Sequence, residues 1–213
     1  MKTYETARLI LRPYRITDID AVHEYSSDPE NLTYMLWGPN TPEETREFIE
    51  DAIAAAGSPD PEEYLFAVIE KSSGMLIGGG LISVSGPVRP GVPEAASASY
   101  PGYGSGELGW IIRRDRQKLG YGTELGAFLV DLGFGELGLH RLCAHCDAEN
   151  YGSRRVMENI GMRQEGLFLE ARRPHKKSTR RFSDEYSYAM LRRDWTPGSS
   201  GYMPLRRESE ENT

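Results

Sequence analysis

The stretch Arg116-Gln117-Lys118-Leu119-Gly120-Tyr121-Gly122-Thr123 is the most informative part of this 213-residue chain. It lies between an apolar segment with the pattern of a strand, 107–113, and a segment with the pattern of an amphipathic helix, 123–137. The two glycines let the backbone turn sharply, and the first turn of a helix supplies unpaired N–H groups and the positive end of the helix dipole. This arrangement suits a pyrophosphate.

Two interpretations of this turn stay open from its residues alone. Its spacing matches neither the three-glycine dinucleotide fingerprint nor the nucleotide-binding loop that ends in Gly-Lys-Ser/Thr, so magnesium-dependent phosphoryl transfer is disfavoured. Two glycines before a helix also occur in an ordinary tight turn, which binds nothing.

The residues before the turn predict a strand, two helices and a hairpin. Thr17 is a candidate cap for the first helix, and Thr41, Pro42 and Glu44 form a capping box for the second, which we expect to end near Gly57. Three consecutive glycines, 78–80, indicate a bulge or the close approach of another backbone. The expected strands are 7–14, 64–71 and 75–85.

The residues after the turn predict a further strand, a helix and two closing strands. The expected ranges are 140–147, 152–160, 163–170 and 182–191. Three polar segments lie outside this pattern: a long insertion loop at 86–106, a basic link at 172–181 and a disordered tail at 196–213. We therefore predict one mixed α/β domain over residues 1–195.

Composition narrows the class of protein but not its chemistry. The net charge of −7 argues against a surface that binds nucleic acid as a whole. Neither an apolar run long enough to span a membrane nor a signal peptide is found, and two cysteines cannot form a disulfide scaffold. We expect a soluble protein of the cytoplasm with reduced thiols and no contact with a membrane.

Several spaced motifs together resemble the GCN5-related N-acetyltransferase (GNAT) superfamily. Gln117, Gly120 and Gly122 match its Q/R-x-x-G-x-G/A signature. The chain also resembles the ribosomal-protein N-terminal acetyltransferase branch (RimJ/RimL-like) over about residues 5–195. The motifs that carry this second resemblance are ETARLILRPY, ELGW, LGLHRL, NYGSRRVMENIGM, RQEGL and DEYSYAMLRRDW, in that order.

The resemblance implies a single, mostly antiparallel sheet of about seven strands with about four helices. It also implies a V-shaped splay between the fourth and fifth strands, in which the pantetheine arm of acetyl-CoA lies. The expected contacts are backbone groups of Trp110 and Ile112, with Ile111 between them, and the amides of Gln117, Lys118, Leu119, Gly120, Tyr121, Gly122 and Thr123 at the pyrophosphate. Asn150 resembles the asparagine that bonds to the pantetheine arm in this family, although an asparagine also caps a helix on its own.

Acetyl transfer to an amine needs a proton acceptor and a partner for the leaving thiolate. Glu107 is the candidate base, because some members carry a glutamate at that point; a glutamate at the start of a strand is also commonly just solvated. The family's usual tyrosine acid is replaced by Met157. Ser153 lies one helical turn before it and is the candidate partner of the thiolate, with simple capping as the alternative.

The pair Cys143 and Cys146, with His140 and His145, invites a zinc interpretation. On a strand the two thiols face opposite sides, whereas a zinc site needs convergent ligands, so we expect no metal. No pattern indicates an activated cysteine either, and direct transfer needs none.

The acceptor amine is the most open part of the prediction. Acidic residues of the second helix region would attract a cation, as would any exposed acidic face. They are Glu43, Glu44, Glu47, Glu50, Asp51, Glu62 and Glu63. The basic link could be a solvated loop, a contact with ribosomal RNA or a contact with the 3′-phosphate of CoA. We expect acetylation of a protein or peptide α-amine; the alternatives are a small amine such as an antibiotic or a polyamine, or a non-catalytic acyl-CoA-binding module. A homodimer is compatible with each.

Overall fold

A twisted sheet organises the residues that the structure, a computed structural model, describes: 1–59, 61–86, 104–173, 182–198 and 203–204. Nine strands follow one another in the order β7-β8-β6-β5-β4-β3-β2-β1-β9. Every neighbouring pair is antiparallel except β5 and β6, which are parallel. The strands are β1 (Tyr4–Glu5), β2 (Leu9–Arg12), β3 (Glu63–Glu70), β4 (Leu76–Ser85), β5 (Ser105–Ile112), β6 (Arg141–Asp147), β7 (Arg163–Arg172), β8 (Ser183–Leu191) and β9 (Met203–Pro204).

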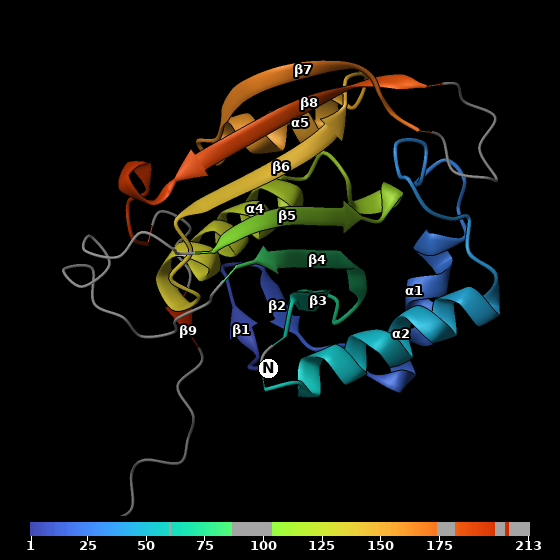
Figure 1. The fold of residues 1–213 in the computed structure, drawn as a ribbon. Helices are drawn as coiled ribbons and strands as arrows, with labels where there is room; N and C mark the ends of the chain where they lie inside the picture. Colours follow the sequence, from blue (N-terminus) through green and yellow to red (C-terminus); the bar gives the residue numbers. More distant parts are fainter. Residues whose placement is uncertain (60, 87–103, 174–181, 199–202, 205–213) are drawn as a thin grey trace, which may run out of the picture.

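Helices cover both faces of this sheet (Figure 1). One hydrophobic cluster joins the sheet to α4 and α5, and a second joins it to α1 and α2. The helices are α1 (Ile19–Ser26), α2 (Pro42–Gly57), α4 (Tyr121–Asp131) and α5 (Tyr151–Asn159), with short turns η1 (Ile16–Asp18), η2 (Arg114–Arg116), η3 (Leu132–Glu136) and η4 (Arg192–Asp194). None of the helices in the described ranges is long and apolar enough to cross a membrane.

The expected mixed α/β fold is therefore confirmed, with two very short strands added. β9 pairs with β1, so residues 203–204 of the expected tail belong to the sheet. β5 already starts at Ser105, which shortens the expected loop, and most of that loop (87–103) lies outside the described residues. The same holds for 174–181 of the basic link and for most of the tail.

The start of α2 shows why a capping box marks a helix. The Thr41 hydroxyl accepts the Glu44 N–H at 3.2 Å, and the Glu44 carboxylate accepts the Thr41 N–H at 2.7 Å. Pro42 occupies the first helical position, where a missing N–H costs nothing. The helix ends at Gly57 as expected.

The prediction that Thr17 caps the first helix is wrong. Thr17 lies inside η1, and Asp18 provides the polar contact by accepting the Arg15 N–H at 2.8 Å. Arg12 holds the same carboxylate with two hydrogen bonds, at 2.7 and 2.8 Å. Asp18 makes this contact in place of the neighbouring Thr17 hydroxyl because the charged Arg12 of the preceding strand binds its carboxylate.

The three glycines of β4 each allow a different close approach. A Cβ on Gly78 would lie 2.1 Å from the Ile111 carbonyl oxygen, one on Gly79 would lie 2.4 Å from the Tyr14 hydroxyl, and one on Gly80 would lie 2.9 Å from Leu125. The expected close approach of another backbone is confirmed at Gly78.

Candidate functional site

The sheet opens between its two parallel strands. β5 and β6 pair only at Ser105–Arg141, Gly106–Leu142 and Glu107–Cys143, although β5 continues to Ile112 and β6 to Asp147. Beyond Glu107 the strands diverge, as the expected V-shaped splay requires.

Backbone groups of β5 face the opening. The Ile111 carbonyl lies against Gly78 of β4, and the Arg113 N–H donates to the Ile77 carbonyl at 2.8 Å. Because successive residues of a strand direct their backbone groups to opposite sides, those of Trp110 and Ile112 point toward β6. The Ile112 carbonyl accepts the Gln117 side-chain amide at 3.0 Å, which leaves Trp110 with both groups facing the gap.

The glycine turn forms a cradle of N–H groups at the end of β5. Gly120 adopts φ 85° and Lys118 φ 63°, and no side chain caps α4. The N–H groups of Tyr121, Gly122 and Thr123 begin the helix and have no acceptor within it. The helix starts at Tyr121, two residues before the expected Thr123. This earlier start is possible because Gly120, in the left-handed conformation, completes the turn. Leu119 belongs to the same turn, and its carbonyl accepts from Arg8 at 2.9 Å.

Gly122 has a second structural reason to be glycine. A Cβ there would lie 3.2 Å from Val156 of α5, and one on Gly126 would meet the same side chain at the same distance. The two helices that border the gap therefore pack closely through small residues.

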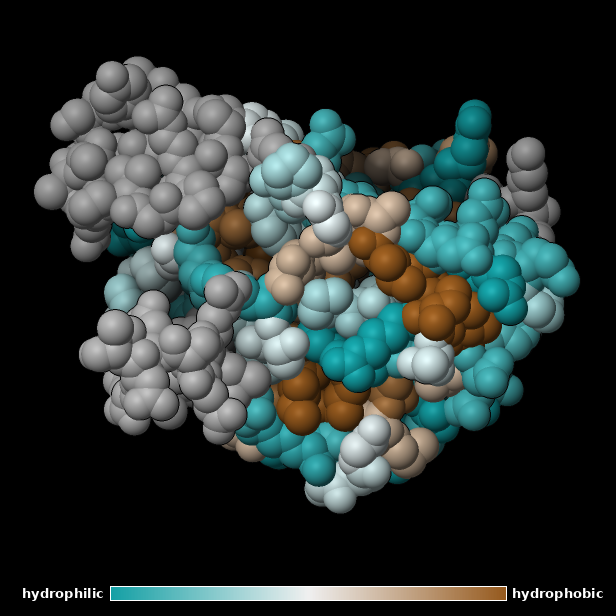
Figure 2. All heavy atoms as spheres, turned by 90° about the horizontal axis from the view of Figure 1, so that it is seen from below, coloured by the Kyte–Doolittle hydropathy of each residue, from teal (hydrophilic) through white to brown (hydrophobic). Residues whose placement is uncertain are grey.

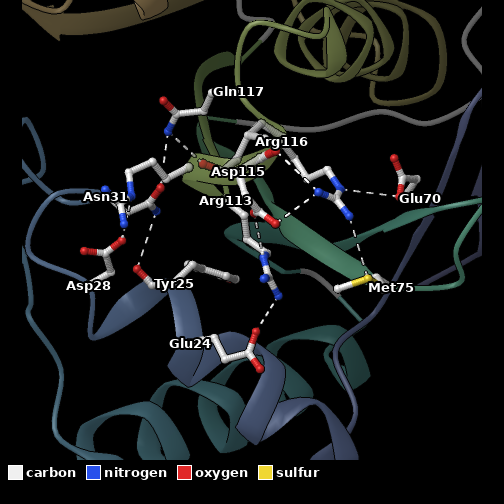
Figure 3. A network of polar contacts seen from close by, with 12 residues as sticks. Glu24, Tyr25, Asp28, Asn31, Glu70, Met75, Arg113, Asp115, Arg116 and Gln117 are labelled. Carbon is white, nitrogen blue, oxygen red and sulfur yellow. Dashed lines mark hydrogen bonds and ion pairs between the residues drawn. The ribbon is translucent and has the colours of Figure 1, made fainter.

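A polar network fixes this turn to the first helix (Figure 3). The Gln117 amide also donates to Asn31 at 3.2 Å, and the Asn31 amide donates to the Tyr25 carbonyl at 3.4 Å. Arg113 bonds Glu24 and lies 3.1 Å from Asp115. Arg113 is thus paired with carboxylates, so the turn offers an anion its backbone N–H groups and the exposed Lys118 ammonium.

A cavity of about 720 Å³ runs through the opening. Trp110 and Cys146, on the α4 and α5 side of the sheet, line it together with Glu107 and Ile111, on the α1 and α2 side. Residues 34–37, between α1 and α2, form a further wall. The cavity thus reaches both faces of the sheet.

Asn150 and Ser153 border this cavity at the start of α5. The Asn150 side-chain oxygen accepts the Ser153 N–H at 3.0 Å, so Asn150 does cap the helix. That bond uses the oxygen and leaves the amide NH₂ for another partner. The bond uses only the backbone of Ser153, and its hydroxyl is not the cap. Met157 is fully buried in the core.

Glu107 is the last residue of β5 that pairs with β6, and its side chain is exposed at the cavity. Its strand partner Cys143 carries a thiol whose pKa is raised by burial and by the nearby Glu107 charge. That thiol is therefore held neutral.

The two cysteines face opposite sides of β6, as predicted. Cys146 packs into the core, where burial raises its pKa to about 11. Within the described residues, no group of three or more His, Cys, Asp or Glu side chains could hold a metal ion.

Three polar residues of the site were missed in the sequence. Arg172 of β7 donates to Glu185 of β8 at 2.8 Å and to the Tyr34 carbonyl at 3.1 Å, and it is largely buried. His145 lies 3.6 Å from the same glutamate. Arg172 is thus an ion-paired strand residue and not part of a solvated link. The alternation of Arg141, Cys143, His145 and Asp147 along β6 was the one signal that could have placed His145 beside Glu107.

The acidic residues of the α2 region lie outside the cavity. They are exposed, and the acidic residues that line the cavity are Glu107, Asp147 and Glu185 among those described. Figure 2 views the molecule from below, toward the side of α2, and shows broad hydrophilic areas with smaller hydrophobic ones between them. These acidic residues are therefore exposed to solvent and do not line the cavity.

Comparison with known proteins identifies the family. Residues 8–163 match the family model of the acetyltransferase (GNAT) domain. The chain belongs to the GNAT family. It is 32% identical over 190 residues to the uncharacterized N-acetyltransferase YnaD of Bacillus subtilis, covering 89% of this chain and 97% of that protein. This GNAT chain is an acetyl-CoA-dependent acyltransferase, an N-acetyltransferase.

Solved structures agree with this assignment. The GNAT-family acetyltransferase from Bacillus anthracis is 31% identical, with a TM-score of 0.71 over 90% of this chain and 99% of that one. Two more distant structures share the fold: a ribosomal-protein-S5-alanine acetyltransferase from Vibrio fischeri (18% identical, TM-score 0.68, 92% of this chain and 100% of that one), and a spermidine N-acetyltransferase from Vibrio cholerae in complex with CoA and spermine (22%, 0.67, 88% and 98%).

Proposed function

We propose that this GNAT enzyme transfers the acetyl group of acetyl-CoA directly to the α-amine of a protein or peptide, as in the RimJ/RimL-like branch. The observation that carries the proposal is the cavity that passes through the splayed strands. It brings backbone hydrogen-bonding groups, the Glu107 carboxylate and the Ser153 hydroxyl to the same opening. We propose that the enzyme acts in the cytoplasm, as a monomer or as a homodimer.

The residues at the gap fit acetyl-CoA. Trp110 would hold the pantetheine arm as an added strand, with Ile111 and Ile112 beside it, and the Asn150 amide would donate to the same arm. The N–H groups from Gln117 to Thr123, with the start of α4, would bind the pyrophosphate. When bound, acetyl-CoA supplies an activated thioester.

Glu107 would attract the incoming amine and accept a proton from it, directly or through a water. The pKa of an α-ammonium group is near 8 and that of a lysine side chain is near 10.4. A weaker base therefore suffices to deprotonate an α-amine than to deprotonate a lysine. Ser153 would donate a hydrogen bond to the leaving thiolate, since the thioether of Met157 has no proton to donate.

The charges at the cavity favour an α-amine over a polyamine. Of the three acidic side chains in its lining, Glu185 is paired with Arg172, and Asp147 accepts from Ser183 at 2.6 Å. Asp147 is also buried, so Glu107 is the one exposed carboxylate of these three, which matches a substrate with one charge at the reacting end. The fold shared with a spermidine N-acetyltransferase keeps a small amine as the second candidate.

Thiol release from acetyl-CoA, measured with peptides of different N-termini, spermidine and an aminosugar, tests the proposal. We expect the highest kcat/KM with a peptide α-amine. Turnover with spermidine or the aminosugar alone would establish the second candidate. Binding of acetyl-CoA without transfer to any of them would contradict both and leave a binding module.

Glu107→Gln is the matched test of the base. We expect kcat to fall about 10²-fold because the proton acceptor is lost, while the Kd for acetyl-CoA is unchanged. Glu50→Gln, on the exposed face of α2, is the control and should leave kcat unchanged. Normal turnover of Glu107→Gln would remove this residue from the mechanism.

A further inference from the structure

The cavity wall opposite Glu107 carries a second group that can accept a proton. His145 lies two residues after Cys143, the strand partner of Glu107, so its side chain is on the same face of the sheet. Its ring lines the same cavity. Glu107 and His145 therefore border the opening from its two strands.

The surroundings of His145 place one of its ring nitrogens near a carboxylate. Its Nδ1 atom is buried, has no hydrogen-bond partner among the described residues, and faces the Glu185 carboxylate at 3.6 Å. Arg172 holds the other oxygen of Glu185 at 2.8 Å and is itself fixed to the Tyr34 carbonyl. A proton on Nδ1 would point at Glu185, which leaves Nε2 as the acceptor.

An alkylammonium substrate must lose two protons to become an amide. The first proton comes from an ammonium group with a pKa near 8. In model compounds the pKa of an imidazole is about 2 units closer to that value than the pKa of a carboxylate is. The second leaves a nitrogen that is already bonded to the acetyl carbon, carries a positive charge and is far more acidic. A weak base such as a carboxylate suffices for that step.

We propose that the two residues divide these protons. His145 takes the first from the ammonium, with Glu185 and Arg172 as positioning residues, and Glu107 takes the second as the N–C bond forms and the C–S bond breaks. One proton passes to the departing thiolate beside Ser153 and the other to solvent, so amide, thiol and one proton are the products. This inference rests on the proposed amine acetylation.

Acceptors of different basicity test this division. An alkoxyamine or acyl hydrazide is already neutral at pH 7 and does not need the first deprotonation. We expect His145→Ala to lower kcat/KM for an alkylamine at least about 10²-fold and to change it little for the alkoxyamine. Glu107→Gln should lower both. Imidazole in solution should rescue His145→Ala with the alkylamine and should not rescue Glu107→Gln.

The controls separate a proton role from a structural one. His140→Ala, the same change at the exposed residue just before β6, should leave kcat/KM unchanged for both acceptors. The calorimetric Kd for acetyl-CoA and the unfolding midpoint of His145→Ala should equal those of the parent. Glu185→Gln should show the same dependence on acceptor, with a smaller loss.

Each further outcome decides between the two proposals. Equal losses for both acceptors in His145→Ala, or no loss, would overturn the division of protons and leave the acetyltransferase function standing. If the parent enzyme binds acetyl-CoA but acetylates neither acceptor, the proposed function fails, and the assignment to His145 fails with it.

Discussion

Ser153 offers a hydroxyl that capping does not use. Its backbone N–H bonds Asn150, and this bond survives removal of the side chain. The Ser153 side chain can therefore be removed without loss of the helix cap, unlike the side chain of a serine that is itself the N-cap. That separation makes its chemical role open to a clean test.

Ser153→Ala should lower kcat about tenfold or more by removing the donor to the thiolate, while the unfolding free energy changes by less than about 0.5 kcal/mol. Steady-state kinetics and urea unfolding measure the two quantities. Ser58→Ala, after the end of α2 and absent from the cavity lining, is the control. An unchanged kcat would refute the role of the hydroxyl.

Gly120 combines a backbone requirement with a position at the turn that is proposed to bind the pyrophosphate. Its φ of 85° disfavours any Cβ, and a Cβ there would lie 3.3 Å from an Arg8 nitrogen. We expect Gly120→Ala to cost about 1–2 kcal/mol of unfolding free energy and to raise the Kd for CoA. Gly57→Ala meets no atom within 4 Å and should be neutral or stabilising. Equal CoA affinity of the two variants would show that the turn does not bind the pyrophosphate.

Among the elements, α4 is tied to the N-terminal strands through one carboxylate. Glu124 accepts from the Thr6 hydroxyl at 2.5 Å and from Arg8 twice, at 2.7 Å from the backbone and 2.7 Å from the side chain. Burial disfavours the charged form of Glu124, but these donors outweigh it, and the pKa is lowered from its usual 4.5. The helix that follows the glycine turn is thereby anchored to the link between β1 and β2.

The lowered pKa predicts a pH dependence of stability. The contribution of Glu124 is complete above pH 4.5, the ordinary value for the unfolded chain, and is lost as the pH falls through the lower folded value. Glu124→Gln should cost about 2 kcal/mol at pH 7, and its difference from the parent should shrink below pH 4.5. Urea unfolding at several pH values measures this. A difference that is constant with pH would exclude the charge as its cause.

At the scale of the whole molecule, local sequence patterns predicted the helices and strands but not the contacts between them. The Thr41 capping box and the alternation of Leu9 and Leu11 depend on neighbours in sequence, and both were interpreted correctly. The pairing of Arg172 with Glu185 and the approach of His145 depend on the register of β6, β7 and β8, which no local pattern encodes. The prediction of a Thr17 cap failed for a similar reason, since Arg12 of the preceding strand binds Asp18 instead.

The cavity also predicts the kinetic order of the whole enzyme. Direct transfer needs both substrates bound at once, and the neutral Cys143 thiol is a poor acceptor for an intermediate acetyl group. Initial rates at varied acetyl-CoA and amine should give intersecting reciprocal plots. Parallel plots, with acetylated Cys143 found by mass spectrometry, would contradict direct transfer.

The opening reaches both faces of the sheet, and this has a consequence for the size of the substrates. In the proposed arrangement, a donor along Trp110 and the start of α4 would approach from one side, and an acceptor beside Glu107 and residues 34–37 would approach from the other. The two molecules do not compete for room except at the reacting atoms. A bulky macromolecule can therefore present one chain end through the acceptor mouth while the nucleotide portion of the donor remains seated behind the sheet.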